Sequence, residues 1–195
     1  MWEGLRQGLA ARERRALVRP REAAVLVPIV DDGGELRLVL TRRTDSLSSH
    51  RGHVAFPGGR IDPEDDGFLG AALREAREEI GLDPSQVEVI GAIDDFPTVT
   101  NDTTVTPVVA RLGKTPAYVP NPHEVARVFE IPLAVLRRPE SWEVYEVEHG
   151  GVRWPMYSCL WDGETLWGLS AYITLHLLDL MPGGAPFALP ARPHL

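Results

Sequence analysis

The segment ALREAREEIGL, residues 72–82, is the most informative stretch of the chain, because it predicts a helix with two chemically distinct faces. At about 100° per residue, a helix gathers the apolar side chains on one face: Leu69, Ala72, Leu73, Ala76 and Ile80. Glu75, Glu78 and Glu79 gather on another face, within an arc of about 100°. The pattern predicts a helix over residues 68–81. Gly81 ends this helix, and Pro84 prevents it from continuing.

The acidic face of this helix predicts a site for a hard divalent cation. Glu75 and Glu79 lie one turn apart, so their carboxylates can reach the same point, although like charges at this spacing cost a few tenths of a kcal/mol. Carboxylate oxygens are the ligands that such cations prefer. A solvated acidic face is the alternative, because Arg74 and Glu78 form an i,i+4 pair and Arg77 dilutes the charge.

The upstream context favours the metal site. FPGG (56–59), a loop and REAREEIGL (74–82) together resemble the signature of the Nudix hydrolases. That signature is a Gly, five residues, a Glu, seven residues and then Arg-Glu-apolar-x-Glu-Glu-x-Gly-apolar. Its second half is matched by Arg74, Glu75, Ala76, Glu78, Glu79, Gly81 and Leu82. In the first half Gly59 lies one residue further upstream than the pattern expects, and Asp65 or Asp66 takes the place of the Glu.

A second resemblance is to the bacterial coenzyme A pyrophosphatases within this family. The segment LVLTRRTDSLSSHRGHVAFPGGRIDPED (38–65) is similar to the stretch that marks them. PNPHEVARVFEIPL (120–133) and LWGLSAYI (166–173) are similar to that group as well, so the resemblance covers about residues 23–181. Its matched positions are Leu40, Thr41, Arg42, Arg43, Leu47, His50, Gly52, Val54, Phe56, Pro57, Gly58, Gly59 and Asp62.

An α+β fold follows from the predicted element order of strands, helix, strands, helix, and the resemblance implies a Nudix α/β/α sandwich with a mixed β-sheet. We expect a single domain over 1–195, with an N-terminal helical extension over about 1–20 and a loose tail over 182–195. Helices are predicted over 3–17, 68–81 and 168–181. Strands are predicted over 23–30, 36–43, 54–59, 87–96, 104–112 and 124–133, with a hairpin formed by 143–149 and 152–161.

The resemblance implies Mg²⁺ or Mn²⁺ as cofactor, with Glu75 and Glu79 as main ligands. Glu78 would share a metal or bind its water, and the carbonyl of Gly59 would add a further oxygen. Glu79 and Glu78 would take part in catalysis, and Glu124 and Glu78 compete for the role of general base. Arg74 is expected to hold a glutamate carboxylate. The roles of Asp65 and Asp66 are left open, beyond capping of the following helix by one of them.

Local charge predicts an anionic ligand beside the metals. Residues 42–60 contain four arginines against Asp45, a formal charge of +3, whereas residues 62–83 carry −6. Arginine offers bidentate donors to a phosphate such as the 3′-phosphate of coenzyme A. The residues that we expect to bind substrate are Arg42, Arg43, His50, Arg51, Gly52 and Phe56, and His53 belongs to the same basic pool. For Arg51 and His53 a solvated loop charge is the stronger alternative.

The composition of the whole chain excludes several other classes. The net charge is −8 over 195 residues, so a generally basic nucleic-acid binder is excluded. The single Cys159 excludes an internal disulfide framework and reads as a small buried hydrophobe. We find no secretory signal or membrane-spanning stretch and expect a cytoplasmic protein. One of the five tryptophans could stack on adenine, although burial is the simpler alternative, and a homodimer is an open possibility.

These observations predict a pyrophosphatase that cleaves coenzyme A and its thioesters to 3′,5′-ADP and 4′-phosphopantetheine or its acyl form. One alternative is a Nudix hydrolase of another nucleoside diphosphate derivative, such as ADP-ribose or NADH, or of a nucleoside triphosphate. A second alternative is a Nudix-fold sensor that binds a nucleotide without cleaving it. Such sensors usually lack the metal-binding glutamates, which this chain retains.

Overall fold

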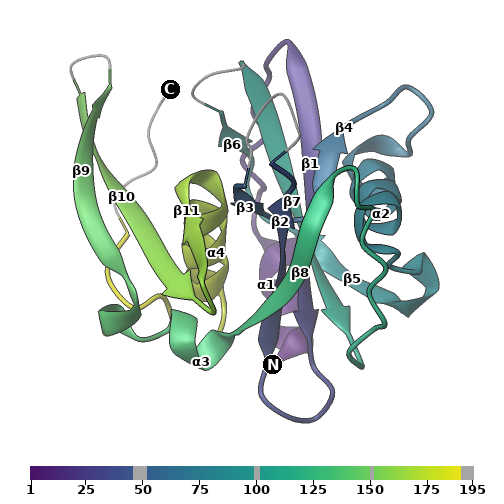
Figure 1. Ribbon diagram of the computed structural model, residues 1–195. Helices are drawn as coiled ribbons and strands as arrows, with labels where there is room; N and C mark the ends of the chain where they lie inside the picture. The colour runs from purple at the N-terminus through teal and green to yellow at the C-terminus, as the bar shows by residue number, and fades with distance from the viewer. Residues whose placement is uncertain (46–51, 99–101, 150–151, 190–195) are drawn as a thin grey trace.

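Helices cover both faces of one mixed β-sheet in the computed structural model, which describes residues 1–45, 52–98, 102–149 and 152–189 (Figure 1). The sheet has eight strands: β1 (Arg21–Val30), β2 (Arg37–Arg43), β3 (Val54–Ala55), β4 (Gly58–Arg60), β5 (Val87–Ala92), β6 (Phe96–Pro97), β7 (Thr103–Leu112) and β8 (Val125–Pro132). Its main order is β3-β2-β1-β7-β5, while β4, β6 and β8 pair with β1, β7 and β2. β1 and β7 run parallel, and the other pairs are antiparallel.

The layers follow from where the helices pack. The helices are α1 (Trp2–Ala11), α2 (Gly67–Ile80), α3 (Leu133–Leu136) and α4 (Gly168–Leu180), with 3₁₀ turns at η1 (Pro84–Gln86) and η2 (Pro139–Ser141). α2 covers one face of the sheet, and α1 and α4 cover the other (Figure 1). A second sheet of β9 (Glu143–His149), β10 (Val152–Trp161) and β11 (Glu164–Trp167) packs on the far side of α4. The predicted α/β/α sandwich with a mixed sheet is confirmed.

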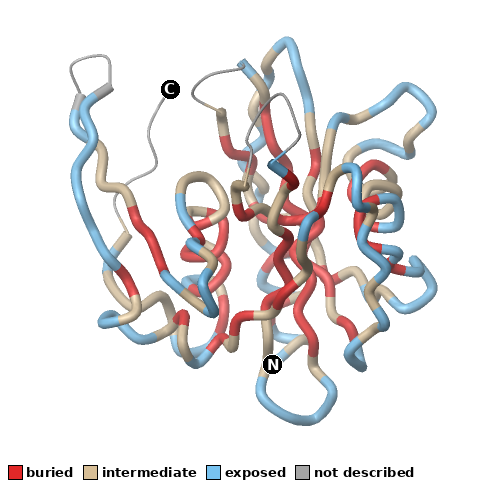
Figure 2. The backbone as a smooth tube through the Cα atoms, viewed as in Figure 1, coloured by how far each residue is buried: buried red, intermediate tan, exposed pale blue. Residues whose placement is uncertain are grey.

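Two buried clusters hold these layers together, and both lie against the central sheet (Figure 2). On one face, Ala72, Ala76 and Ile80 of α2 pack against Leu26 and Val108. The predicted helix thus turns its apolar face to the sheet, and it ends where expected, because Gly81 adopts a left-handed conformation at φ 68°. Cys159 is fully buried, as predicted. None of the described helices is long and apolar enough to cross a membrane.

Several predicted elements differ in extent. The N-terminal helix ends at Ala11 instead of residue 17, because the backbone beyond it bonds to the carboxylates of Asp94 and Asp95. The predicted strand over 54–59 divides into β3 and β4 around Pro57, which has no N–H to donate. Strand β11 was not predicted. In the tail that was expected to be loose, Phe187 stacks on Tyr157 with 5.1 Å between ring centroids.

Candidate active site

The acidic face of α2 lies against the glycine turn that begins β4. Gly58 and Gly59 pair with Val25 and Ala24 of β1, so the turn is fixed to the centre of the sheet. The Gly58 N–H donates to Glu79 Oε2 at 3.1 Å. A β-carbon at position 59 would lie 2.2 Å from Glu75 Oε1, and one at position 58 would lie 2.4 Å from the Ala24 carbonyl oxygen. Position 58 requires glycine because a side chain would displace the backbone of β1, and a side chain at position 59 would displace the Glu75 carboxylate.

Arg74 organises the loop between the glycine turn and the helix. Its guanidinium donates to both oxygens of Asp65 at 2.9 Å and to the Arg60 carbonyl at 3.0 Å. It also donates to Glu75 at 3.0 Å and to Glu78 at 3.1 Å. Arg74 therefore holds glutamates, as expected, and the bidentate bond answers the open question about Asp65. Neither aspartate caps the helix through its side chain, since Asp66 takes the N-cap position without a side-chain bond.

Burial raises the pKa of two carboxylates of α2, Glu75 and Glu79. Glu79 is only 2% exposed, and this burial raises its pKa to about 7, against the opposing effects of the Gly58 N–H and the Arg43 charge. Burial also raises the pKa of Glu75, while the bond from Arg74 opposes the rise. Glu78 differs, because its side chain is 55% exposed. Buried Glu79 and half-buried Glu75 thus lie where a compensating positive charge would stabilise their ionised forms.

Glu124 lies close enough to influence both Glu75 and Glu79. Its negative charge contributes to the raised pKa of Glu75 and of Glu79. The loop before β8 brings it there, because the Asn121 N–H donates to the Glu79 carbonyl at 2.8 Å and the Asn121 side chain donates to Glu124 at 3.3 Å. The structure therefore brings this predicted residue, 45 positions beyond Glu79, to the same end of α2.

The donor set fits a hard divalent cation, although its members do not enclose one point. Among the described residues, no three His, Cys, Asp or Glu side chains converge as a metal cage. Arginines stand among the carboxylates instead: Arg74 contacts Glu75 and Glu78, and Arg43 lies 3.4 Å from Glu79. Carboxylate and carbonyl oxygens are the ligands that Mg²⁺ and Mn²⁺ prefer, and the glycine turn places its backbone against them. The ligand roles of Gly59, Glu75, Glu78 and Glu79 stay predictions.

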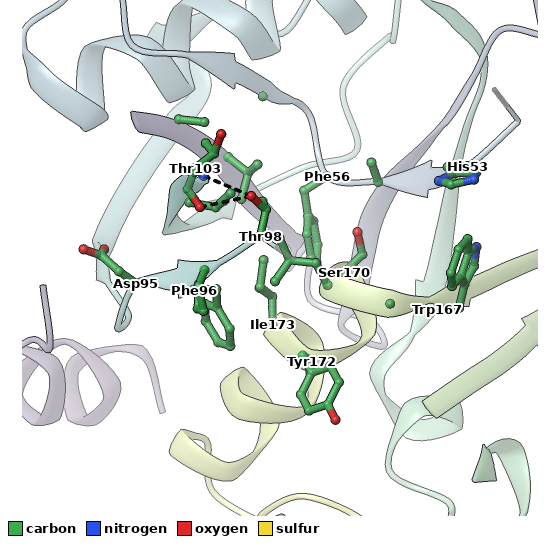
Figure 3. Close-up of a pocket in the computed structure, with 18 of the residues that line it drawn as sticks. His53, Phe56, Asp95, Phe96, Thr98, Thr103, Trp167, Ser170, Tyr172 and Ile173 are labelled. Carbon is green, nitrogen blue, oxygen red and sulfur yellow. Dashed lines mark hydrogen bonds between the residues drawn. The ribbon is translucent and has the colours of Figure 1, made fainter. Parts of the chain in front are cut away.

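A cavity of about 1100 Å³ opens beside the glycine turn (Figure 3). Its floor is the face of the main sheet that carries Ala23, Val25 and Val105, and Gly58 and Gly59 lie at its edge. Phe56 lies near Ser170 and Ile173 of α4 in the lining, while His53 and Trp167 meet edge to face with 4.8 Å between their centroids (Figure 3). The β9–β10 hairpin contributes a further wall with Trp154 and Met156. A space of this size can hold a nucleotide-sized ligand.

The predicted substrate-binding residues divide into three groups. Arg43 and Phe56 line the cavity. Arg42 does not; it is ion-paired with Asp45 at 3.1 Å and lies 3.8 Å from Glu164. Gly52 forms a turn at φ 65° beside Asp45. His50 and Arg51 lie outside the described residues.

Sequence reasoning missed several cavity-lining residues. Arg15 and Leu17 come from the segment over about 1–20 that was predicted to be an extension, and Arg21 is the first residue of β1. Trp154 and Trp167 were considered as stacking residues but not distinguished from the other tryptophans. The one available signal was the alternation of Arg21, Ala23 and Val25, which places all three on one face of β1.

Comparison with known proteins agrees with this geometry. The family model described as the NUDIX domain matches residues 20–151. A Yersinia pestis protein named as an uncharacterized Nudix hydrolase, NudL, is 39% identical over 160 residues, which cover 80% of this chain and 78% of that protein.

Two solved structures are also similar. The Nudix hydrolase RenU of M. smegmatis is 26% identical with a TM-score of 0.50, covering 60% of this chain and 73% of that one. A MutT/nudix family protein of Enterococcus faecalis also has a TM-score of 0.50, covering 83% of this chain and 59% of that one. Its sequence is 18% identical, so this similarity supports the fold alone.

Proposed function

This chain belongs to the Nudix family of hydrolases, and from that premise we propose that its substrates are coenzyme A and its thioesters. The general activity, of which coenzyme A cleavage would be one case, is hydrolysis of nucleoside diphosphate derivatives. The observation that carries the proposal is that Gly58 and Gly59 line the large cavity and also contact the carboxylates of Glu79 and Glu75, so the glycine turn joins the cavity to the acidic face of α2. The resemblance of residues 38–65 to coenzyme A pyrophosphatases supports the choice of substrate. The cytoplasmic location and a homodimer stay predictions.

In the proposed reaction, the oxygen of a water molecule bonds to one phosphorus of the diphosphate. The bond from that phosphorus to the bridging oxygen breaks, and the second phosphate leaves with the electron pair. The chemistry that Mg²⁺ or Mn²⁺ supplies is neutralisation of the phosphate charge and acidification of the attacking water. Glu75, Glu79 and the Gly59 carbonyl would hold the metal, and Glu78 would share it or bind its water.

The surrounding residues then have defined tasks. The missing side chains of Gly58 and Gly59 let strand β1 and the Glu75 carboxylate pack directly against the turn. Arg74, held by Asp65, keeps Glu75 and Glu78 oriented. Glu124 takes the proton of the attacking water, with Glu78 as the competing base. Phe56 and the tryptophans of the cavity exclude water from the rest of the substrate.

The test is turnover with Mg²⁺ on coenzyme A, dephospho-coenzyme A, ADP-ribose, NADH and a nucleoside triphosphate, with products identified by mass. We expect coenzyme A to give 3′,5′-ADP and 4′-phosphopantetheine, with kcat/KM at least about tenfold above that for dephospho-coenzyme A. Another substrate cleaved best would leave the hydrolase intact and overturn the coenzyme A assignment. Nucleotide binding without any turnover would favour the sensor.

Glu79→Gln tests the role of the buried carboxylate. We expect kcat to fall by at least about 100-fold with an unchanged fold, since a neutral amide is a poor ligand for a hard cation. Glu35→Gln is the matched control, because Glu35 is exposed in the turn between β1 and β2. An unchanged metal-dependent rate in Glu79→Gln would contradict the assignment.

A further inference from the structure

We infer that Arg15 and Arg21 form a second anion site in the cavity, which binds a phosphate monoester on the nucleoside part of the substrate. The inference rests on the proposed function, because it takes the diphosphate to lie at the glycine turn. Both arginines line the cavity that also contains Gly58 and Gly59. Arg15 lies outside the matched family domain, which begins at residue 20. Arg21 lies just inside that domain, and neither arginine belongs to the signature formed by FPGG and REAREEIGL.

Strand β1 fixes the position of Arg21 relative to the glycine turn. Ala24 pairs with Gly59, and Arg21 lies three residues earlier on the same strand, about 10 Å away along it. Arg21, Ala23 and Val25 alternate along β1 and all line the cavity, so they share one face. An arginine side chain can span part of this distance. A phosphate one sugar ring from the diphosphate would therefore come within its reach.

The backbone of Arg15 is held in place by two hydrogen bonds. Its N–H donates to Asp94 Oδ1 at 3.0 Å, and its carbonyl accepts from the Asp95 N–H at 3.0 Å. The following turn is tied down as well, because the Leu17 N–H donates to Asp95 Oδ2 at 2.9 Å. A segment fixed in this way presents its side chain to a ligand at a reduced entropy cost. The strap over residues 12–17 thus makes Arg15 part of the cavity wall.

The formal charge of the cavity lining favours an anion. Within the described residues, four arginines line the cavity (Arg15, Arg21, Arg43 and Arg60) together with two carboxylates, Asp95 and Glu148, and Arg43 also contacts Glu79. Asp95 already accepts bonds from Thr106 and from Arg14, so its charge is compensated locally. The chain as a whole has a net charge of −8. A basic cavity in an acidic protein attracts an anionic ligand selectively, and arginine matches phosphate with bidentate donors.

The chemistry of the substrate identifies the second anion as the 3′-phosphate of coenzyme A. This group is one ribose ring from the diphosphate, and ADP-ribose and NADH do not have it. The assignment replaces Arg42 as the anticipated partner of the 3′-phosphate, since Arg42 is ion-paired with Asp45 away from the cavity lining. Arg15 and Arg21 would then determine the preference for coenzyme A over dephospho-coenzyme A.

Calorimetric binding of 3′,5′-ADP and of 5′-AMP, both in Mg²⁺, tests this site without turnover. We expect the wild-type chain to bind 3′,5′-ADP at least about tenfold more tightly, as one charged hydrogen-bonded contact provides. Arg15→Ala and Arg21→Ala should each reduce this ratio about fivefold, and the double variant should abolish it. Affinity for 5′-AMP should stay within about twofold. Arg6→Ala is the matched control, because Arg6 bonds to Glu88 and to the Val89 carbonyl outside the cavity.

The site is overturned if the wild-type chain does not distinguish the two ligands, or if the double variant keeps the preference. Equal loss of both ligands would also overturn it, because that result indicates a general structural effect. Arg15→Lys and Arg21→Lys keep the charge and should retain part of the preference, which provides a test if an alanine variant does not fold. If coenzyme A is not cleaved in the substrate panel, the proposed function is overturned. The anion site is tested independently of that result, because the ratio of the two binding constants does not depend on cleavage.

Discussion

Glu79 combines two properties that rarely occur together in a carboxylate, since it is almost fully buried and faces other acids. The nearby acids Glu75 and Glu124 add to the effect of burial on its pKa, and the contact with Arg43 at 3.4 Å compensates only part of it. In a protein without metal this arrangement opposes folding when Glu79 is ionised. We interpret the destabilisation as the cost of a preformed cation site.

This cost predicts a pH-dependent stability in EDTA. The pKa of Glu79 is about 7 in the folded chain, against an ordinary value of 4.5. Below pH 4.5 both states hold the proton and the cost is absent. Between 4.5 and 7 the unfolded chain loses the proton first, so the free energy of unfolding falls, by up to about 3 kcal/mol above pH 7. Glu79→Gln should therefore be more stable than wild type at pH 8 and equal at pH 4.5, as measured by urea unfolding.

The control for this experiment lies on the same helix. Glu78 is 55% exposed, so Glu78→Gln should show no comparable gain between the two pH values. Addition of Mg²⁺ should stabilise wild type at pH 8 and leave Glu79→Gln nearly unchanged, because binding to the folded state alone raises stability. A Glu79→Gln variant that is less stable than wild type at pH 8 in EDTA would contradict this account.

At the scale of elements, the strap over residues 12–17 is held by two adjacent carboxylates with different burial. The Asp95 side chain is 4% exposed and bonds to Thr106, Arg14 and the Leu17 N–H. The Asp94 side chain is 16% exposed and bonds to Arg12 and the Arg15 N–H. The helix predicted through residue 17 ends early because these bonds satisfy the backbone in an extended conformation.

We expect Asp95→Ala to lower the free energy of unfolding by about 3 kcal/mol, since it leaves a buried hydroxyl and a backbone N–H without their acceptor. Asp94→Ala, with a more exposed carboxylate, should cost about 1 kcal/mol. Equilibrium urea unfolding at pH 7 measures both. Equal losses in the two variants would show that burial of Asp95 does not determine the strength of the strap.

At the scale of the whole molecule, one buried cluster joins parts of the chain that are distant in sequence. It contains Leu5 of α1, Phe56 beside the glycine turn, Phe129 of β8, Leu166 of β11 and Ile173 of α4. The N-terminal helix and the second sheet therefore share a core with the main sheet. A single domain over 1–195 stays a prediction, and this core shows that the helix α1 of the predicted extension packs with the rest of the described chain.

A single domain of this kind should unfold in one cooperative step. We expect tryptophan fluorescence and far-ultraviolet circular dichroism to give coincident urea transitions, and calorimetric and van't Hoff enthalpies to agree. Trp142 and Trp161 report on the region of the second sheet, whereas helix α2, which contributes to the dichroism, lies on the opposite face of the main sheet. A separate early transition in fluorescence alone would show that the second sheet and α4 form an independent unit.

Local pattern was sufficient to predict the parts of the site that lie within one element. The apolar and acidic faces of α2, its end at Gly81, and the proximity of Glu75 to Glu79 all follow from helical periodicity, which depends on neighbours three and four residues apart. The glycine turn was identified by resemblance to the family signature. Its physical requirement, 2.2 Å between a β-carbon at 59 and Glu75, became visible only in the folded chain.

Tertiary structure decided what depends on contacts between distant segments. The bond of Arg74 to Asp65, the approach of Glu124 to Glu79, and the strap that brings Arg15 into the cavity wall join residues 9, 45 and about 80 positions apart. No local propensity encodes such pairs, because their geometry is set by how the strands order and the helices pack. By itself, the sequence determined the Nudix fold and the acidic helix; the packed chain determined the cavity, its basic lining and the burial that gives Glu79 its unusual acidity.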